Sequence, residues 1–232
     1  MALAGTVQWE ARSTGNTANG GGFNASASGA DLSQQDSPEA TYTDLVIAAT
    51  TTNLSSVARP FVAADVGNIL NITSGATFTV GRYEVISVTA GVATMDRSVG
   101  TAGGGGNGRL GGALATVAGA LSAMVASNTI WVKGSHSTAS TISGGTAGTG
   151  PLPSRIIGYT TTRAAAMTAT IPDALYATIT STNAAATTVL SLTGNHWVVL
   201  NLKIDGADLS QTCFQLGTSG STAFIDSVWA TR

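Results

Sequence analysis

The sequence predicts an all-β protein in which a small antiparallel β barrel or sandwich is followed by one helix and a short solenoid of stacked parallel strands. Two observations carry this prediction. Between residues 41 and 102, β-branched and aromatic runs alternate with turn residues, as in small antiparallel domains. After residue 128, short apolar runs return at intervals of roughly 20 to 27 residues, which is a spacing typical of stacked repeats.

Residues 1–40 are predicted to form an extended N-terminal attachment arm. The segment is rich in Gly, Asn and Ser, so it offers too little apolar surface to fold by itself. A disordered tail is the alternative. Trp9 and Phe23 favour the arm, because a disordered tail has little use for large aromatic side chains. Together with Arg12, they are the predicted partner-binding residues.

Residues 41–102 are predicted to form the small β domain, and residues 103–109 a Gly-rich, flexible joint. The glycines do not form a phosphate-binding loop, because no Lys-Ser or Lys-Thr pair follows them.

A helix is predicted to open the last segment, residues 110–232. Apolar residues recur there at steps of three and four, which places them on one helical face. They are Leu110, Leu114, Val117, Leu121 and Val125. Asn128 is the expected C-cap.

The solenoid is predicted from five short apolar strands. They begin at Thr129, Ser154, Ala177, Trp197 and Ala223. The last two align best, with Leu200 beneath Ile225 and Asn201 beneath Asp226. Stacking lets coils that cannot close a core alone bury a continuous one. A β-sandwich with long loops is the competing interpretation.

Two stretches resemble known families. Residues 109–133, Arg-Leu-Gly-Gly-Ala-Leu through Asn-Thr-Ile-Trp-Val-Lys, resemble the entry to a pectate-lyase-like right-handed parallel β-helix. Residues 61–96, with Phe-Val-Ala-Ala-Asp-Val-Gly and Gly-Arg-Tyr-Glu-Val-Ile, are similar to a small β module of tailed-bacteriophage proteins. The resemblance implies that the helix caps the first coil and that the chain is a virion protein.

The resemblance also implies more coils than this chain holds. The sequence stops directly after a predicted strand, so the expectation is either a longer polypeptide or a neighbouring subunit over the open coil. Together with the low charge, this favours a homo-oligomer, with a homotrimer as the leading prediction.

No catalytic, cofactor or metal site is predicted. Enzymes that cleave polysaccharides by hydrolysis need two carboxylates, but the segment after residue 110 has no Glu and only four Asp. They are Asp173, Asp205, Asp208 and Asp226. A calcium site at Asp205 and Asp208 is a minor alternative. Cys213 is expected to be a small core residue.

Composition narrows the partners. Charged residues make up 9% of the 232 residues and the net charge is −2, without a basic cluster, so nucleic-acid binding is not expected. The sequence shows neither a signal peptide nor an apolar run long enough to span a membrane. The expected location is a virion, assembled in the cytoplasm of a bacterial host.

The leading hypothesis is a non-enzymatic capsid decoration, cement or head-fibre protein that binds other virion proteins through residues 1–40. A tail fibre or tailspike that binds host surface glycan is the alternative. A polysaccharide-degrading enzyme is a third hypothesis, which the small number of carboxylates disfavours.

Overall fold

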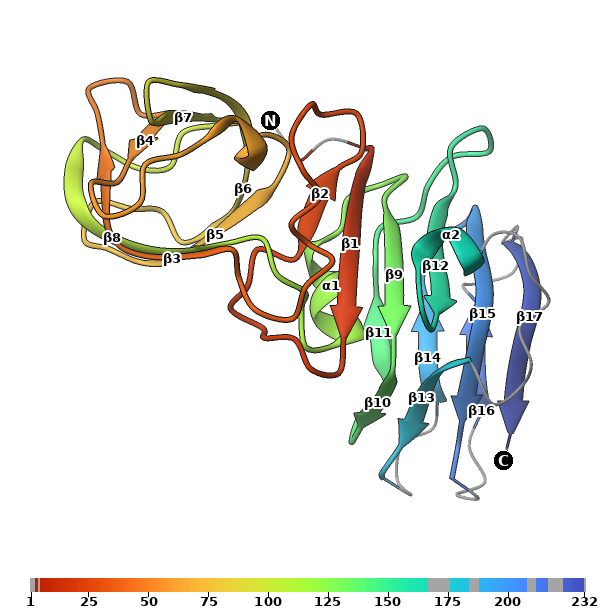
Figure 1. The fold of residues 1–232 in the computed structure, drawn as a ribbon. Coiled ribbons are helices and arrows are strands. Elements are labelled where there is room, and N and C mark those ends of the chain that lie inside the picture. Colours follow the sequence, from red (N-terminus) through yellow and green to blue (C-terminus); the bar gives the residue numbers. More distant parts are fainter. Residues whose placement is uncertain are drawn as a thin grey trace. The chain divides into compact units, whose positions relative to one another are not determined.

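The computed structural model describes residues 3, 5–166, 176–183, 188–207, 212–216 and 223–231. The chain divides into two compact units, each considered by itself. The N-terminal unit comprises Met1–Trp9 and Gly15–Leu114, and the C-terminal unit comprises Glu10–Thr14 and Ala115–Arg232. Strands dominate both units, which confirms the all-β class (Figure 1).

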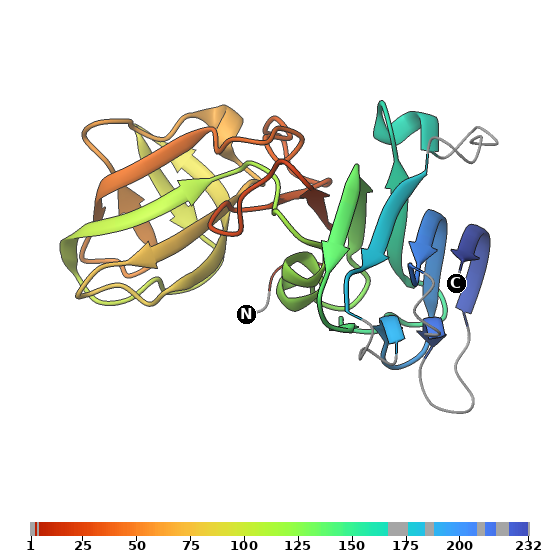
Figure 2. The same cartoon turned by 90° about the horizontal axis from the view of Figure 1, so that it is seen from below.

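The N-terminal unit contains a closed antiparallel barrel, as the sequence predicts. The closed order is β3-β4-β7-β6-β5-β8, and β8 lies beside β3 (Figure 2). Its strands are β3 (Ala40–Ile47), β4 (Asn53–Ser55), β5 (Ile69–Ser74), β6 (Gly81–Thr89), β7 (Val92–Met95) and β8 (Gly103–Leu110), with the 3-10 helix η1 (Ala63–Asp65) before β5.

Alternation along the strands fills the barrel. In β3, Tyr42, Leu45 and Ile47 are buried while most of the residues between them are exposed or half-buried. Tyr42 stacks on Phe61 with ring centroids 5.0 Å apart. Each fully buried side chain of this size contributes roughly 1.5–3 kcal/mol, so the barrel has a core of its own.

The predicted flexible joint is instead strand β8, which closes the barrel. Glycine is needed here for close packing. A Cβ on Gly106 would lie 2.4 Å from the ring of Phe78, and one on Gly103 would lie 2.6 Å from Oγ1 of Thr77. A run of glycines can mark a flexible segment, but it can also mark a strand whose backbone lies very close to neighbouring atoms. The prediction of a joint is wrong because the second case applies here.

The described residues 5–9 and 15–40 belong to the N-terminal unit, whereas the sequence predicts an extended attachment arm over residues 1–40. Strands β1 (Val7–Arg12) and β2 (Gly22–Asn24) pair antiparallel, with Trp9 opposite Gly22. Close backbone contacts add to the burial of Trp9 and Phe23: a Cβ on Gly20 would lie 1.8 Å from the carbonyl oxygen of Ile69. The glycines therefore let this segment lie directly against the barrel backbone.

The C-terminal unit contains two parallel sets of strands. In the larger set, β9 (Thr129–Lys133), β12 (Ser154–Tyr159), β15 (Trp197–Asp205) and β17 (Ala223–Thr231) follow one another side by side (Figure 1). Strand β13 (Ala177–Ser181) lies between β10 (Ser135–Thr138) and the end of β15. The smaller sheet has the order β11-β14-β16, formed by Ile142–Gly144, Thr188–Leu192 and Thr212–Leu216.

Parallel pairing stacks like residues on one another. One such ladder runs through Ile130, Ile156, Val199 and Ile225. The first three are fully buried, whereas Ile225 is 44% exposed. The ladder gives the larger set a continuous apolar seam.

The predicted spacing of the layers is wrong in one place. The strand at Ala177 does not stack as a separate repeat after β12. Strands β12 and β13 instead pair with successive parts of the same strand, β15. The short helix α2 (Arg163–Ala166) follows β12 along the chain.

The predicted alignment of the last two layers is also wrong by one residue. Ile225 lies over Val199, and Asp226 lies over Leu200 rather than Asn201. A shift of one residue exchanges the two faces of a strand.

The predicted helix is shorter than its periodicity suggests. Helix α1 (Val117–Ala123) begins at the N-cap Thr116, whose Oγ1 accepts a hydrogen bond of 3.0 Å from the Gly119 amide. Leu110 belongs to β8, because Gly111 and Gly112 adopt left-handed φ values of 64° and 69° and end any regular repeat there. The C-cap is Met124 rather than Asn128.

Candidate functional site

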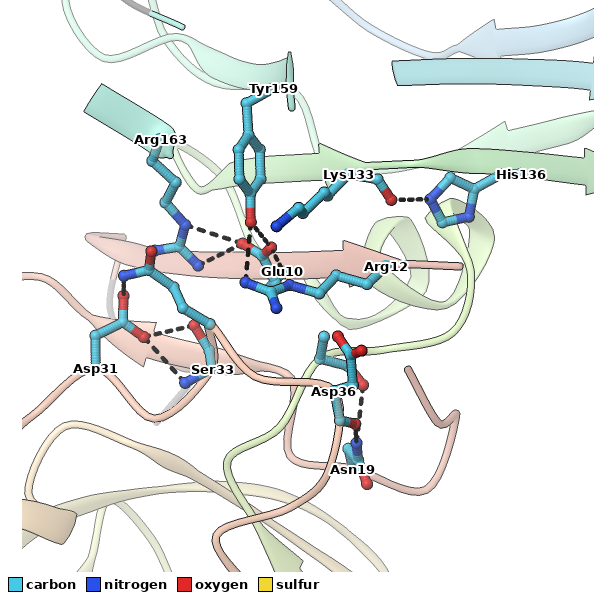
Figure 3. A network of polar contacts seen from close by, with 12 residues as sticks. Glu10, Arg12, Asn19, Asp31, Ser33, Asp36, Lys133, His136, Tyr159 and Arg163 are labelled. Atoms are coloured by element: carbon cyan, nitrogen blue, oxygen red, sulfur yellow. Dashed lines mark hydrogen bonds and ion pairs between the residues drawn. The ribbon is translucent and has the colours of Figure 1, made fainter. Parts of the chain in front are cut away.

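The main polar cluster of the C-terminal unit surrounds Glu10, a fully buried carboxylate near the end of β1 (Figure 3). Oε2 of Glu10 accepts two hydrogen bonds from Arg163, from Nε at 2.9 Å and from Nη2 at 2.7 Å. Oε1 accepts from Nε of Arg12 at 2.8 Å and from the Tyr159 hydroxyl. The four side chains form the Glu10 cluster.

Aromatic rings extend the Glu10 cluster along the strands. Trp131 of β9 meets Tyr159 of β12 edge to face, with centroids 6.2 Å apart. The Arg163 guanidinium lies 5.6 Å from the Trp131 ring, and Nζ of Lys133 lies 5.6 Å from the Tyr159 ring. These cation–π contacts help to hold the cations near one carboxylate.

The electrostatics of the Glu10 cluster oppose proton transfer. Burial raises the pKa of Tyr159 above its usual value, and the nearby Glu10 carboxylate raises it further. Burial acts to lower the pKa of Arg12. The hydrogen bond to Glu10 and the negative charge of Glu10, together with Tyr159, act in the opposite direction and outweigh it, so the pKa of Arg12 is raised. Tyr159 and Arg12 therefore stay protonated near neutral pH, and the Glu10 carboxylate accepts hydrogen bonds from Arg12, Tyr159 and Arg163. The arrangement is suited to holding β1, β12 and α2 together.

A second polar feature is a pocket of about 360 Å³ at the start of α1. Its polar lining is formed by Ser13, Thr116, Ser135, His136, Ser137 and Thr138. His136 is only 6% exposed, and its Nε2 lies 3.2 Å from the carbonyl oxygen of Lys133. Burial lowers the pKa of His136, although hydrogen bonds to the backbone of Lys133 and Ala115 partly oppose this effect.

This buried imidazole predicts a pH dependence of stability. The unfolded chain, with a histidine pKa near the ordinary value of 6.5, binds a proton that the folded chain resists. Stability is therefore complete above about pH 6.5 and falls as the pH drops toward the lower folded pKa. We expect the melting temperature of the wild type to fall from pH 7.5 to pH 5.5, and His136→Gln to reduce that fall.

The variant His196→Asn is the control, because Asn tolerates the left-handed φ of 63° at position 196. It should keep the pH dependence of the wild type. Thermal melts followed by circular dichroism would measure all three proteins. An unchanged slope in His136→Gln would contradict the prediction.

The structure places the three predicted partner-binding residues inside the chain or in the Glu10 cluster. Trp9 is fully buried and Phe23 is 8% exposed, so neither ring is available as an anchor for another protein. Arg12 is half-buried and ion-paired with Glu10. These positions remove the physical basis for attachment through the two aromatic side chains.

The aspartates of the predicted calcium alternative are only partly described. Asp205 accepts a hydrogen bond of 2.8 Å from the Ala207 amide and lies 3.5 Å from Nζ of Lys203. Asp173 and Asp208 lie outside the described residues. Within the part of the chain that the structure describes, no group of three or more His, Cys, Asp or Glu could hold a metal ion. Cys213 is buried, as expected for a core residue.

Sequence reasoning missed Glu10, Tyr159 and Arg163. The prediction counts carboxylates only after residue 110, yet Glu10 belongs to the same unit although it lies near the N-terminus. The available signal was a lone Glu between Trp9 and Ala11 in an apolar strand. A buried carboxylate needs donors, but its position does not say which ones.

No family model, no curated protein and no solved structure matches the chain. Among the described residues, no helix has the length and apolar character needed to cross a membrane.

Proposed function

We propose that this chain is a non-enzymatic structural protein of a tailed-bacteriophage virion, built from a β barrel and a short right-handed parallel β-helix. The observation that carries the β-helix is the ladder from Ile130 to Ile225. Successive parallel pairings keep the same residues in line, and the smaller sheet repeats this behaviour through Ile142, Leu190 and Phe214. Handedness comes from the resemblance to pectate-lyase-like proteins.

The contacts of helix α1 support its proposed role as a cap. It contacts β9 and β11, which are the first strands along the chain in the two parallel sets. Its buried residues Val117, Ala120 and Leu121 supply the apolar surface. A helix in this place would cover the core of the first coil, as terminal caps do in solenoid proteins.

The chemistry of the described polar groups supports a structural role. The Glu10 carboxylate is bound by two arginines and a tyrosine, and hydrolysis of a glycosidic bond needs a second, separately placed carboxylate. The proposed partners are other virion proteins, in the capsid as a decoration, cement or head-fibre protein. Attachment through Trp9 and Phe23 is not part of this proposal, because both are buried.

Immunogold labelling of phage particles tests the proposal. Particles banded in a density gradient, from a lysate of cells in which the gene is expressed with its phage, should carry the protein at a fixed copy number. Gold on the heads is the expected result. A protein that stays with the soluble lysate would overturn the virion assignment, and gold on the tails would overturn the capsid location in favour of the tail-fibre alternative.

A further inference from the structure

Strand β10 lies at the end of its sheet, where the described pairings join it to β13 and to no other strand. The carbonyl oxygens of Gly134 and Thr138 accept hydrogen bonds of 3.1 and 2.8 Å from amides in and directly after β13. Every second residue of a strand bonds to the same parallel neighbour. The N–H and C=O groups of Ser135 and Ser137 therefore point away from β13, toward the free edge of β10.

The pocket of about 360 Å³ lies beside this free edge. Its lining includes Ser13, residues 115–118 and all four residues of β10, whereas no residue of the described strand β13 lines it. A Cβ on Gly134 would lie 2.7 Å from Oγ of Ser13, so Ser13 lies against the chain where β10 begins. The buried Val117 and Ile142 add apolar surface. We call this pocket, together with the free edge, the β10 groove.

The sequence of β10 does nothing to keep another strand away from this edge. Protected sheet edges usually carry lysine, proline or a bulge. Strand β10 instead reads Ser-His-Ser-Thr, and its register with β13 is continuous. Ser135 and Ser137 are both exposed, so their backbone groups are open to a partner. The edge is thus suited to binding an extended backbone.

The lining of the β10 groove defines the chemistry of its occupant. Among the described lining residues none is Asp, Glu, Lys or Arg, so a charged side chain would lose water without gaining an opposite charge. Alternate side chains of a strand point to the same face, so every second residue of an added strand enters the pocket. Hydroxyl groups lie there beside the apolar Val117 and Ile142. This mixture fits uncharged side chains of the size of valine or threonine.

We propose that the β10 groove binds an extended, uncharged segment of another protein, which adds to the sheet as a strand beside β10. The backbone groups of Ser135 and Ser137 hold its main chain, and the pocket selects its side chains. A second copy of this chain is a poorer fit, because residues 115–118 flank the same edge there and the two segments would meet. The contact goes beyond the proposed function, since it needs the groove and not a place in a virion.

Panning a displayed library of random dodecapeptides on the full chain gives the first test. The recovered peptides should be uncharged and rich in valine and threonine. Ser137→Pro should weaken their binding at least about 10-fold, because proline removes the N–H group and its ring blocks the edge. Ser137→Ala is the matched control, since it keeps the amide and removes only the hydroxyl, and it should retain binding.

A second variant blocks the groove without touching β10. Ala118 lines the pocket and is exposed, so Ala118→Phe fills the pocket without disturbing the core. It should also abolish binding of the recovered peptides. Circular dichroism melts would show that Ala118→Phe and Ser137→Pro fold, and Ala118→Phe keeps the test decisive if the proline variant does not.

Amide hydrogen exchange followed by NMR measures the added strand directly. In the chain alone, the amides of Ser135 and Ser137 should exchange faster than those of His136 and Thr138, which face β13. A recovered peptide should slow the two serine amides at least about 10-fold, as hydrogen bonds to a new strand protect them.

Three results would overturn the inference. The library may yield no binder, or its binders may keep their affinity for Ser137→Pro and Ala118→Phe. Serine amides that are already protected in the chain alone would show that the chain itself or a second copy covers the edge. The virion proposal is tested separately, because it depends on the presence of the protein in particles.

Discussion

Replacing Glu10 by glutamine is expected to lower the free energy of unfolding by about 3–5 kcal/mol, the range seen when one partner of a buried ion pair is removed. The carboxylate is fully buried and Arg163 is 8% exposed, so water cannot replace the lost charge. A glutamine would also turn an NH₂ group toward arginine donors. Urea unfolding followed by circular dichroism and tryptophan fluorescence would measure the change.

Glu39→Gln is the matched control for this substitution. Glu39 lies on the surface, where its carboxylate accepts a hydrogen bond of 3.2 Å from the Gln35 side chain. The same chemical change should alter stability there by less than about 0.5 kcal/mol. Equal effects of the two substitutions would show that the Glu10 cluster does not stabilise the fold.

Gly106→Ala is expected to destabilise the barrel by about 1–3 kcal/mol, as overpacked substitutions do. The new Cβ would lie 2.4 to 2.7 Å from three atoms of the Phe78 ring. Phe78 is itself part of the barrel core, so the ring cannot turn away without displacing its neighbours. Thermal unfolding and urea unfolding of the full chain would measure the loss.

Gly104→Ala serves as the control within the same strand. A Cβ there would have an ordinary contact of 3.5 Å with Cγ2 of Val46. Removing a glycine from the unfolded chain then stabilises by about 0.4–1 kcal/mol or leaves stability unchanged. If Gly106→Ala behaved in the same way, the glycine run would be the flexible joint that its composition indicates.

The barrel could be predicted from the sequence because its strands are defined by local patterns. Tyr42, Leu45 and Ile47 alternate with residues that are mostly outside the core, and glycines mark several of the turns. The helix and the glycine run were harder. Leu110 matched a helical repeat by chance, since neighbouring strands and turns also bring leucines to one core.

The register of the parallel strands and the Glu10 cluster could not be predicted in the same way. A one-residue shift between Leu200 and Val199 leaves the apolar pattern almost unchanged, because both neighbours are aliphatic. Glu10 lies 149 residues from Tyr159 and 153 from Arg163. Only the folded backbone brings these residues together, and a single sequence contains no periodicity at such separations.

The division of β1 between the two units has a consequence for how the protein can be made or cut. Glu10–Thr14 belongs to the unit that otherwise consists of Ala115–Arg232. A fragment that begins at residue 110 therefore lacks the carboxylate that Arg163 and Tyr159 enclose. During synthesis, the ribosome releases Glu10 long before either partner exists. A middle part of the C-terminal unit thus closes around the part that is made first, and contacts of such long range slow folding.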